Sequence, residues 1–432
     1  MMNGGVYPVP FGRTVRGRLR LPASKSVTQR YLALALAGRL SLDLEHPLDA
    51  EDPRLFLAAL RVLGFTVEEQ PGRLCLRPPG PRSADPRRRE IFCGNGGTMC
   101  RILTAVLCTV PGRFRLDGVA RLRQRPIGPL VDALGQLGAV LRFTGVPGYP
   151  PLEIDGGTLG GGRARLDAGA SSQFLSALLI AGQAARAPIE IAVEALASSP
   201  YVDLTLETIR ERGGVVEMAD GGRRFATRPS SLMAGSVEIE GDFSAAAYPA
   251  AAAALAGGRV ELEGLHRSSV QGDRGLLAIL VAMGAAVQWQ GDRLVVAGAT
   301  RLRALDVDLS GMPDQVPTIA ALAPFAAGRT RISGVAHLRI KESDRLAAMA
   351  RELGRLGVPV LERPDGLEIE GVWAGGSGSG PPVTVDTHGD HRIAMALAIV
   401  GLRRPGVSIA APQVVGKSYP GFWDHLARLV GS

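Results

Sequence analysis

The chain repeats one pattern along its length, and this repetition limits its fold more than any other feature. A glycine at the end of a predicted helix is separated by two residues from an apolar residue of a predicted strand, at intervals of 74, 75, 71 and 73 residues. The five pairs are Gly64 with Val67, Gly138 with Leu141, Gly213 with Val216, Gly284 with Val287, and Gly357 with Val360. Such regular intervals indicate one supersecondary unit that is used several times.

A second series runs in step with the first and consists of short polar motifs, each of which precedes an Ala-rich apolar helix. The six motifs are Ser24-Lys25-Ser26, Asn95-Gly96-Gly97-Thr98, Ser171-Ser172-Gln173, Gly241-Asp242-Phe243-Ser244, Met312-Pro313-Asp314, and His388-Gly389-Asp390-His391-Arg392. The two series together predict six copies of the unit. The polar groups that an anion-binding enzyme needs would lie at the start of each copy.

The second copy shows the expected order of elements. Its sequence predicts a helix over 98–109, a strand over 113–116, a helix over 129–137, and a hairpin of 140–143 with 152–154. The order is therefore βαβαββ. The first helix of a unit is apolar nearly all round and should be buried, whereas the second has a polar face and should lie outside. Units of this length exceed the roughly 20–50 residues of most open solenoids, so we expect them to close in threes.

Length and composition place the chain among globular proteins. With 432 residues it is too long for one ordinary core, so we predict two domains of three units each. It is 46% hydrophobic and lacks an uninterrupted apolar run of membrane-spanning length, so a cytoplasmic location is expected. Cys75, Cys93, Cys100 and Cys108 lack zinc-knuckle spacing and should be reduced core thiols. The net charge of +8 suits nucleic acid, a membrane surface or small anionic substrates.

The polar motifs of the first half stand where helices begin, and a helix N-terminus presents N–H groups and a partial positive charge that suit phosphate or carboxylate. Lys25, Ser26 and Arg30 add cations and a hydroxyl to the first such end, although a solvated lysine would be equally ordinary there. Gly97 lets the backbone approach a ligand or simply forms a turn, and its motif lacks the ending of a nucleotide-binding loop. Arg125 precedes a proline-started helix and could equally be a surface residue.

The third motif offers more polar groups than one helix start requires. Ser171, Ser172 and Gln173 bring two hydroxyls and an amide, whereas an N-cap needs one such group. Ser198 would lie at the start of the outer helix of the same unit. Serine nucleophile chemistry is not expected, because the chain has no Gly-x-Ser-x-Gly elbow.

The motifs of the second half carry opposite charges. Asp314 precedes an apolar helix, so it is either an N-cap or a general base for a substrate hydroxyl. Lys341-Glu342-Ser343-Asp344-Arg345 has a simpler interpretation as a capping box with internal salt bridges. A metal site at His388-Gly389-Asp390-His391-Arg392 is disfavoured, because both histidines and the aspartate cannot face one ion from a helix. Lys417 could be an ordinary solvated lysine.

Taken together, eight motifs resemble, in the same order, the 3-phosphoshikimate 1-carboxyvinyltransferases, also called EPSP synthases. They are Leu21-Pro22-Ala23-Ser24-Lys25-Ser26 with Arg30, Asn95-Gly96-Gly97-Thr98 with Arg101, Arg125-Pro126-Ile127-Gly128, Ser171-Ser172-Gln173-Phe174, Asp314, Lys341-Glu342-Ser343-Asp344-Arg345-Leu346, Asp390-His391-Arg392-Ile393-Ala394-Met395, and Lys417. The resemblance implies an α/β (α+β) fold, a two-domain inside-out α/β barrel of six βαβαββ repeats whose helix N-termini face a cleft. The implied domains are 23–240, and 1–22 together with 241–432, with hinges near 22 and 240–242.

The resemblance also implies a reaction and its residues. The family transfers the enolpyruvyl group of phosphoenolpyruvate to the 5-hydroxyl of shikimate 3-phosphate and releases phosphate, on the pathway to aromatic amino acids, without a metal or organic cofactor. The implied shikimate 3-phosphate ligands are Lys25, Ser26, Arg30, Ser171, Ser172, Gln173, Ser198, Asp314 and Lys341. The implied phosphoenolpyruvate ligands are Lys25, Gly97, Arg125, Gln173, Arg345, Arg392 and Lys417. Asp314 would be the base at the hydroxyl, and Glu342, helped by Lys25, would transfer the proton at the methylene carbon.

Three positions depart from the family pattern. His337 stands where many relatives have Asn, Ile102 where Pro is usual, and Ser199 where a Lys often precedes the Pro-Tyr pair. The first departure puts one substrate contact in question. The second could alter the angle of the helix that begins near Asn95, and with it the response to glyphosate, the herbicide that targets this family.

Two other functions fit parts of the sequence. Enolpyruvyl transfer to UDP-N-acetylglucosamine uses the same fold, but that family has a loop cysteine near the equivalent of 113–125, and the segment 111–126 here contains none. A basic repeat protein that binds RNA should carry stacking aromatics, whereas aromatics make up 5% of this chain. We therefore expect the two small molecules as partners, a monomer, and no binding of nucleic acid or membrane.

Overall fold

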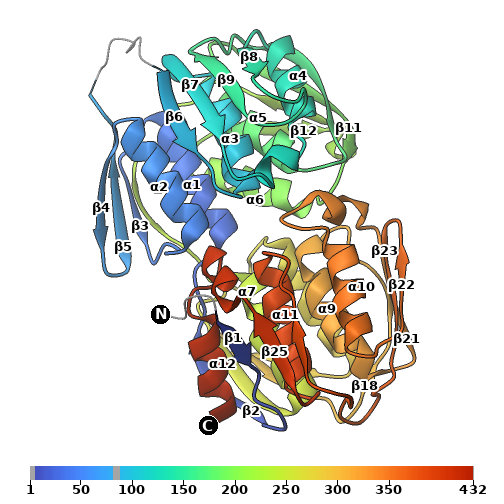
Figure 1. Ribbon diagram of the computed structural model, residues 1–432. Helices are drawn as coiled ribbons and strands as arrows, with labels where there is room; N and C mark the ends of the chain where they lie inside the picture. The colour runs from blue at the N-terminus through green and yellow to red at the C-terminus, as the bar shows by residue number, and fades with distance from the viewer. Residues whose placement is uncertain (1–4, 81–87, 432) are drawn as a thin grey trace. The chain divides into compact units, whose positions relative to one another are not determined.

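The computed structural model describes residues 5–80 and 88–431 of the chain (Figure 1). Its internal contacts divide the chain into two compact units. The N unit is Lys25–Ile239, and the C unit is Met1–Ser24 together with Glu240–Ser432. Helices and strands alternate through both units, so the fold is mixed α/β.

Three four-stranded sheets occur in the described part of the N unit, and they share one strand order, a parallel pair followed by an antiparallel hairpin. In spatial order they are β14 (Gly235–Glu238), β3 (Leu42–Glu45), β5 (Arg73–Arg77) and β4 (Thr66–Gln70); β6 (Arg88–Phe92), β7 (Gly112–Asp117), β9 (Leu152–Gly156) and β8 (Val140–Phe143); and β10 (Gly162–Ala168), β11 (Ile189–Leu196), β13 (Arg224–Thr227) and β12 (Val216–Ala219). Side chains of β11 alternate between buried and exposed, because successive residues of a strand point to opposite faces.

The helices of the N unit are of two kinds. The inner helices α1 (Lys25–Gly38), α3 (Gly97–Leu107) and α5 (Gln173–Gly182) contact one another and are buried along most of their length. The outer helices are α2 (Glu51–Val62), α4 (Gly128–Gln136) and α6 (Pro200–Glu211), with the short 3₁₀ turns η1 (Leu122–Gln124) and η2 (Asp220–Gly222). A helix buried on all sides must be apolar on all sides, which explains the composition of the inner set.

Two four-stranded sheets of the C unit follow the same order, and its described strands also form a three-stranded sheet and a two-stranded pair. They are β2 (Val15–Arg20), β15 (Gly258–Glu263), β17 (Arg293–Ala297) and β16 (Ala286–Gln290); β19 (Asp306–Asp308), β21 (Arg329–Ser333), β23 (Gly366–Glu370) and β22 (Val360–Arg363); β24 (Val383–Val385), β25 (Val407–Ala410) and β1 (Val6–Pro8); and the pair β18 (Leu302–Arg303) with β20 (Ala326–Ala327). No sheet within the described strands of either unit closes on itself, so neither unit is a barrel closed by hydrogen bonds.

Inner helices α7 (Phe243–Ala256), α9 (Val316–Leu322) and α11 (His391–Gly401) pack together in the C unit, and every residue of all three is buried. Its other helices are α8 (Leu276–Met283), α10 (Arg345–Arg355) and α12 (Phe422–Gly431). Its 3₁₀ segments are η3 (Gly272–Gly275), η4 (Pro313–Gln315), η5 (Ala323–Phe325), η6 (Ala336–Ile340) and η7 (Pro412–Lys417). No helix within 5–80 or 88–431 is long and apolar enough to cross a membrane.

The elements predicted for the second copy are confirmed. Helix α3, strand β7 and helix α4 occur where the sequence places them, and β8 pairs antiparallel with β9. Two pairings join segments that lie far apart in the sequence. Strand β2 pairs parallel with β15, and β14 pairs parallel with β3. Residues 15–20 therefore belong to the C unit although they precede the whole N unit in the chain.

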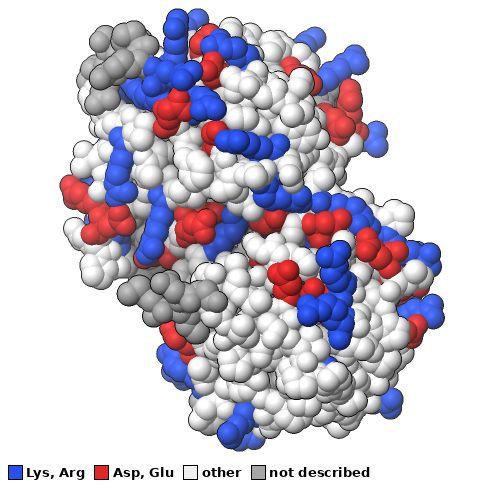
Figure 2. All heavy atoms as spheres, in the orientation of Figure 1, with Lys and Arg blue, Asp and Glu red and all other residues white. Residues whose placement is uncertain are grey.

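Exposed and half-buried charged side chains on several strands are paired with opposite charges. Arg73 and Arg77 contact Asp43 at 2.8 and 2.5 Å, and these hydrogen bonds, Arg77 foremost, lower the pKa of Asp43 to about 2. Arg88 contacts Glu153 at 2.6 Å. Figure 2 shows Lys and Arg interleaved with Asp and Glu over the face in view. The positive excess is therefore not a uniformly basic patch on that face.

The buried alanines of α7 predict a core whose stability falls when a side chain there is enlarged. Ala252 is 1% exposed within this helix, so we expect Ala252→Leu to force apart its neighbours and to lower the free energy of unfolding by about 1–3 kcal/mol. Ala286→Leu, at an exposed position of β16, is the matched control and should change stability little. Urea denaturation followed by circular dichroism measures both. Equal losses in the two variants would contradict close packing around α7.

Candidate active site

All six polar motifs lie between the carboxyl end of a strand and a buried helix, and in four of them that strand and that helix belong to the same unit. These four loops run from β6 to α3, from β10 to α5, from β19 through η4 to α9, and from β24 to α11. Within each unit the inner helices pack against one another. Because the start of a helix exposes N–H groups, each unit gathers donors and polar side chains of several motifs.

In the N unit, Arg101 joins three of the motifs. Its guanidinium donates to Ser171 Oγ at 3.2 Å, to Gln173 Oε1 at 2.8 Å and to the carbonyl of Pro126 at 2.8 Å. Gln173 Nε2 in turn donates to Thr98 Oγ1 at 2.9 Å. The starts of α3 and α5 are thereby fixed side by side.

Gly97 leaves room for the side chain of Arg125. A Cβ atom at this position would collide with the guanidinium of Arg125, which also donates to the carbonyl of Asn95 at 2.9 Å. Arg125 is 3% exposed, although it follows directly on a 3₁₀ turn and could have been a surface residue. The absence of a side chain at Gly97 is what lets this cation lie against the first turn of α3.

Arg30 is a buried cation among neutral groups. Its Nε donates to Thr205 Oγ1 at 2.8 Å, its Nη1 to the carbonyl of Ser26 at 2.9 Å, and its Nη2 to the carbonyl of Tyr201 at 2.7 Å. The side chain is 2% exposed, and burial lowers the pKa of Arg30 to about 10. No carboxylate in the described part of the chain pairs with it. A cation held in this way favours the arrival of an anion.

The remaining residues predicted in the N unit lie around these groups. Lys25 Nζ contacts Asp52 at 3.1 Å, and Ser172 is 4% exposed at the start of α5. Ser198 is buried directly ahead of α6 and has a φ of 54°. A positive φ is uncommon for serine and is often found at functional sites.

In the C unit, Arg345 is surrounded by three carboxylates. It donates to Asp390 at 2.7 Å, to Asp314 at 2.7 Å and to Glu342 at 3.0 Å, and it is 1% exposed. Burial alone would lower the pKa of Arg345, but the charges of Asp390, Glu342 and Asp314 together raise it. Asp390 is also the N-cap of α11 and accepts from the backbone N–H of Arg392 at 2.9 Å.

Asp314 lies between two guanidinium groups. One oxygen accepts from Arg345, and the other accepts from Arg392 at 2.6 Å. Its side chain is 24% exposed, which makes it the most open member of this cluster. The alternative role of N-cap is not supported, because α9 begins after Gln315 without a side-chain cap.

A second carboxylate stands behind Asp314. Asp273 is 4% exposed and accepts from Gln315 Nε2 and Ser244 Oγ, each at 2.8 Å. Burial raises the pKa of Asp273, and the negative charge of Asp314 raises it further. The two carboxylates therefore interact electrostatically near the start of α9.

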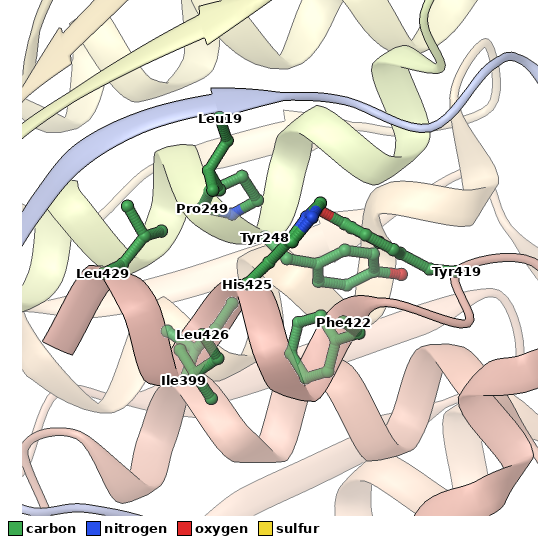
Figure 3. Close-up of a pocket in the computed structure, with 9 residues that line it drawn as sticks. All are labelled: Leu19, Tyr248, Pro249, Ile399, Tyr419, Phe422, His425, Leu426 and Leu429. Atoms are coloured by element: carbon green, nitrogen blue, oxygen red, sulfur yellow. The ribbon is translucent and has the colours of Figure 1, made fainter. Parts of the chain in front are cut away.

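Arg392 also contacts an aromatic side chain, which belongs to a small aromatic cluster. Its Nη1 lies 3.4 Å from the hydroxyl of Tyr248, whose pKa is raised to about 12 by burial. The Tyr248 ring meets Phe422 edge to face, with 5.9 Å between centroids, and lines a narrow apolar crevice beside Tyr419 and His425 (Figure 3). Helix α12 thus packs, through Phe422, against the tyrosine that contacts Arg392.

The two predicted lysines of the C unit flank this cluster in the chain. Lys341 directly precedes Glu342 after η6, and Lys417 ends η7, which packs against α11. Lys417 is 5% exposed, so it is not the solvated lysine that the sequence left open. The capping of α10 comes from Asp344, which accepts from the N–H of Ala347 at 3.0 Å, and this leaves Glu342 to pair with Arg345.

Several of these contacts were not singled out from the sequence. Arg101 and Asp390 stand inside recognised motifs, which was a usable signal. Asp52, Asp273 and Tyr248 carry no such signal, because each becomes significant only through a partner on another element.

Residues 10–426 match the model of a family described as EPSP synthase (3-phosphoshikimate 1-carboxyvinyltransferase). The chain belongs to the EPSP synthase family. The family that the motifs indicated is thereby confirmed, and with it the prediction of an enzyme.

Named relatives agree with this EPSP synthase membership. The 3-phosphoshikimate 1-carboxyvinyltransferase of Syntrophobacter fumaroxidans is 44% identical over 416 residues, which cover 96% of this chain and 97% of that protein. The enzyme of the same name from Thiobacillus denitrificans is 41% identical over 424 residues and 96% of each chain. The solved EPSP synthase of Acinetobacter baumannii is 26% identical, covers 98% of each chain and has a TM-score of 0.77.

His337 yields a prediction on pH. Burial, and then the charge of Lys341, lowers the pKa of His337 to about 4, whereas an unfolded histidine titrates near 6.5. Between these values the unfolded chain binds a proton that the folded chain does not, so stability is lost as the pH falls. We expect acidification from pH 7 to 5 to lower the free energy of unfolding of the parent chain by about 2 kcal/mol more than that of His337→Asn.

Urea unfolding at both pH values measures this difference. His46→Asn, which replaces an exposed histidine, should keep the pH dependence of the parent chain. An unchanged pH dependence in His337→Asn would show that His337 does not hold the lowered pKa.

Proposed function

We propose that the chain transfers the enolpyruvyl (1-carboxyvinyl) group of phosphoenolpyruvate to the 5-hydroxyl of shikimate 3-phosphate and releases phosphate, in aromatic amino acid biosynthesis. The observation that carries the proposal is the placement of Asp314 between the guanidiniums of Arg345 and Arg392 in a chain of the EPSP synthase family. Both substrates carry a phosphate and a carboxylate. A planar guanidinium binds either group through two oxygens.

We assign the residues as follows. The shikimate 3-phosphate ligands are Lys25, Ser26, Arg30, Ser171, Ser172, Gln173, Ser198, Asp314 and Lys341. The phosphoenolpyruvate ligands are Lys25, Gly97, Arg125, Gln173, Arg345, Arg392 and Lys417. The burial of the arginines supports this assignment, because a buried cation interacts with an arriving anion more strongly than a solvated one.

The reaction is an addition followed by an elimination. Asp314 accepts the proton of the substrate hydroxyl while that oxygen attacks carbon 2 of phosphoenolpyruvate, and Glu342, helped by Lys25, delivers a proton to the methylene carbon. Glu342 then takes a proton back from the resulting methyl group while the bond from carbon 2 to the phosphate oxygen breaks, and the electrons of the C–H bond form the carbon–carbon double bond. The leaving phosphate takes the proton that Asp314 had accepted. Arg125, Arg345 and the other cations neutralise the phosphate and the carboxylate throughout.

The two arginines that contact Asp314 influence how it could act as a base. Two guanidiniums stabilise its negative charge at 2.7 and 2.6 Å, and a carboxylate so engaged is a weak base. The anionic groups of phosphoenolpyruvate are competitors for the same two arginines. Binding of the donor substrate would therefore release the base for the acceptor hydroxyl.

The finer architecture is also a proposal. We propose that the chain forms six βαβαββ repeats, three in each of two domains of an inside-out α/β barrel, with sheets outside and helices inside. The shared strand order of the sheets and the burial of the inner helices support it. We place the domains at 23–240, and at 1–22 with 241–432, with hinges near 22 and 240–242.

The proposal extends to the setting of the reaction. We propose a cytoplasmic monomer that acts on two small molecules, without metal, organic cofactor, nucleic acid or membrane. Ile102 is buried on α3 directly after Arg101, so we further propose that it influences the response to glyphosate. Ser199 lies at the N-cap of α6 and His337 in η6, so the two other departures lie close to assigned ligands.

One assay tests the proposed reaction. Phosphate release from phosphoenolpyruvate is measured with shikimate 3-phosphate or UDP-N-acetylglucosamine as the acceptor. We expect release with the first acceptor alone. Release only with UDP-N-acetylglucosamine would favour the related transferase, and release with neither would refute both.

Asp314→Ala tests the assigned base. We expect kcat to fall about 100- to 10,000-fold, because the substrate hydroxyl loses its proton acceptor. Binding of both substrates, measured by calorimetry, should be largely retained, because the other assigned ligands remain and the anionic groups of phosphoenolpyruvate can pair with the two guanidiniums that Asp314 no longer engages. Asp306→Ala removes an exposed carboxylate of β19 and should leave kcat unchanged. Unchanged turnover in Asp314→Ala would remove Asp314 from the base role.

A further inference from the structure

The guanidinium of Arg30 has one fully buried hydrogen-bond partner and two partners from partly exposed residues. Its Nε faces Thr205 Oγ1 at 2.8 Å, and Thr205 is 0% exposed. Its two Nη atoms face the carbonyls of Ser26 and Tyr201, two residues that are partly exposed. The inner edge of the guanidinium is therefore anchored in the core, and its outer edge lies toward the more open side.

The anchor is a small hydroxyl network. Thr205 Oγ1 lies 2.8 Å from Ser176 Oγ and 3.0 Å from the carbonyl of Tyr201. An arginine only donates hydrogen bonds, so Thr205 must accept from Arg30 and send its single proton to one of the other two groups. Ser176 is 1% exposed on α5, so this network ties α1, α5 and α6 together at Arg30.

The network leaves Arg30 with donors for a ligand. A guanidinium carries five N–H groups, and three of those of Arg30 are engaged within the chain, which leaves two, one on each Nη. Their direction depends on the orientation of the whole planar group. That orientation is fixed where the inner edge meets Thr205.

We propose that Thr205 is a positioning residue for Arg30, which it orients so that the two remaining N–H groups meet an anionic or hydroxyl oxygen of shikimate 3-phosphate. The proposal rests on the proposed function, because it takes Arg30 as a ligand of that substrate. Thr205 itself touches no substrate. It acts by holding a cation that has no carboxylate to hold it within the described residues.

The chain offers a matched control on the same helix. Thr208 is also a buried threonine of α6, at 2% exposure, but its hydroxyl donates to the carbonyls of Leu204 and Thr205 at 3.1 and 3.0 Å. Replacing Thr208 by Val therefore removes a hydroxyl from the same helix and a comparable depth. It does not remove an acceptor from Arg30.

The experiment compares Thr205→Val, Thr205→Ser and Thr208→Val with the parent chain. We expect Thr205→Val to weaken the binding of shikimate 3-phosphate about tenfold by calorimetry, because a hydrogen bond to a charged group is lost. The KM for shikimate 3-phosphate should rise in parallel. With that substrate saturating, kcat and the KM for phosphoenolpyruvate should stay within about twofold, since Arg30 is assigned to one substrate only.

The other variants separate positioning from packing. Thr205→Ser keeps the hydroxyl and should restore the binding of shikimate 3-phosphate, whereas Thr208→Val should bind it as the parent chain does. Thermal denaturation checks that all variants are folded. Equal losses in Thr205→Val and Thr208→Val, or no rescue by serine, would overturn the proposal.

Failure of the proposed function gives a different result. If the parent chain neither binds shikimate 3-phosphate nor releases phosphate with it, the assigned reaction is wrong. If the parent chain does both and Thr205→Val matches it, the reaction stands and the role of Thr205 is wrong.

Discussion

The burial of guanidinium groups is the constraint on which the rest of the structure depends. Arg30, Arg345 and Arg392 are each at most 5% exposed, and a cation removed from water must be stabilised by dipoles or by carboxylates. The N unit uses dipoles, because Arg30 is held by two carbonyls and a hydroxyl. The C unit uses carboxylates, because Arg345 contacts three of them. Each solution fixes the beginnings of helices relative to one another within its unit.

The packing of the inner helices makes these contacts possible. Alanines and other small residues dominate α7, and short apolar side chains let helix backbones approach closely. Each polar motif follows a strand and opens a buried helix, so close packing of the helices also gathers the motifs. Gly97 is the extreme case, because even one carbon atom there would displace Arg125. The apolar core and the polar site are thus two consequences of one arrangement.

The charges of the C unit place one carboxylate between two buried cations that we have proposed as substrate ligands. Asp314 accepts hydrogen bonds from both Arg345 and Arg392 and gives each a counter-charge. In the proposed function, the phosphate or carboxylate of phosphoenolpyruvate would replace Asp314 in these contacts. The proposed function therefore links substrate binding and activation of the base through the same two side chains.

The sequence by itself determined the interval of the repeat, the elements of the second copy, the position of each polar motif and the family. These are local properties, since turn glycines, apolar periodicity and short motifs are read within a few residues. Only the tertiary structure decided the partners. It joined Arg30 to Thr205 across 175 positions and Arg101 to Gln173 across 72, and it set Asp273 behind Asp314. The physical reason is that a hydrogen bond between side chains depends on which helices pack together, and packing is not encoded at either position alone.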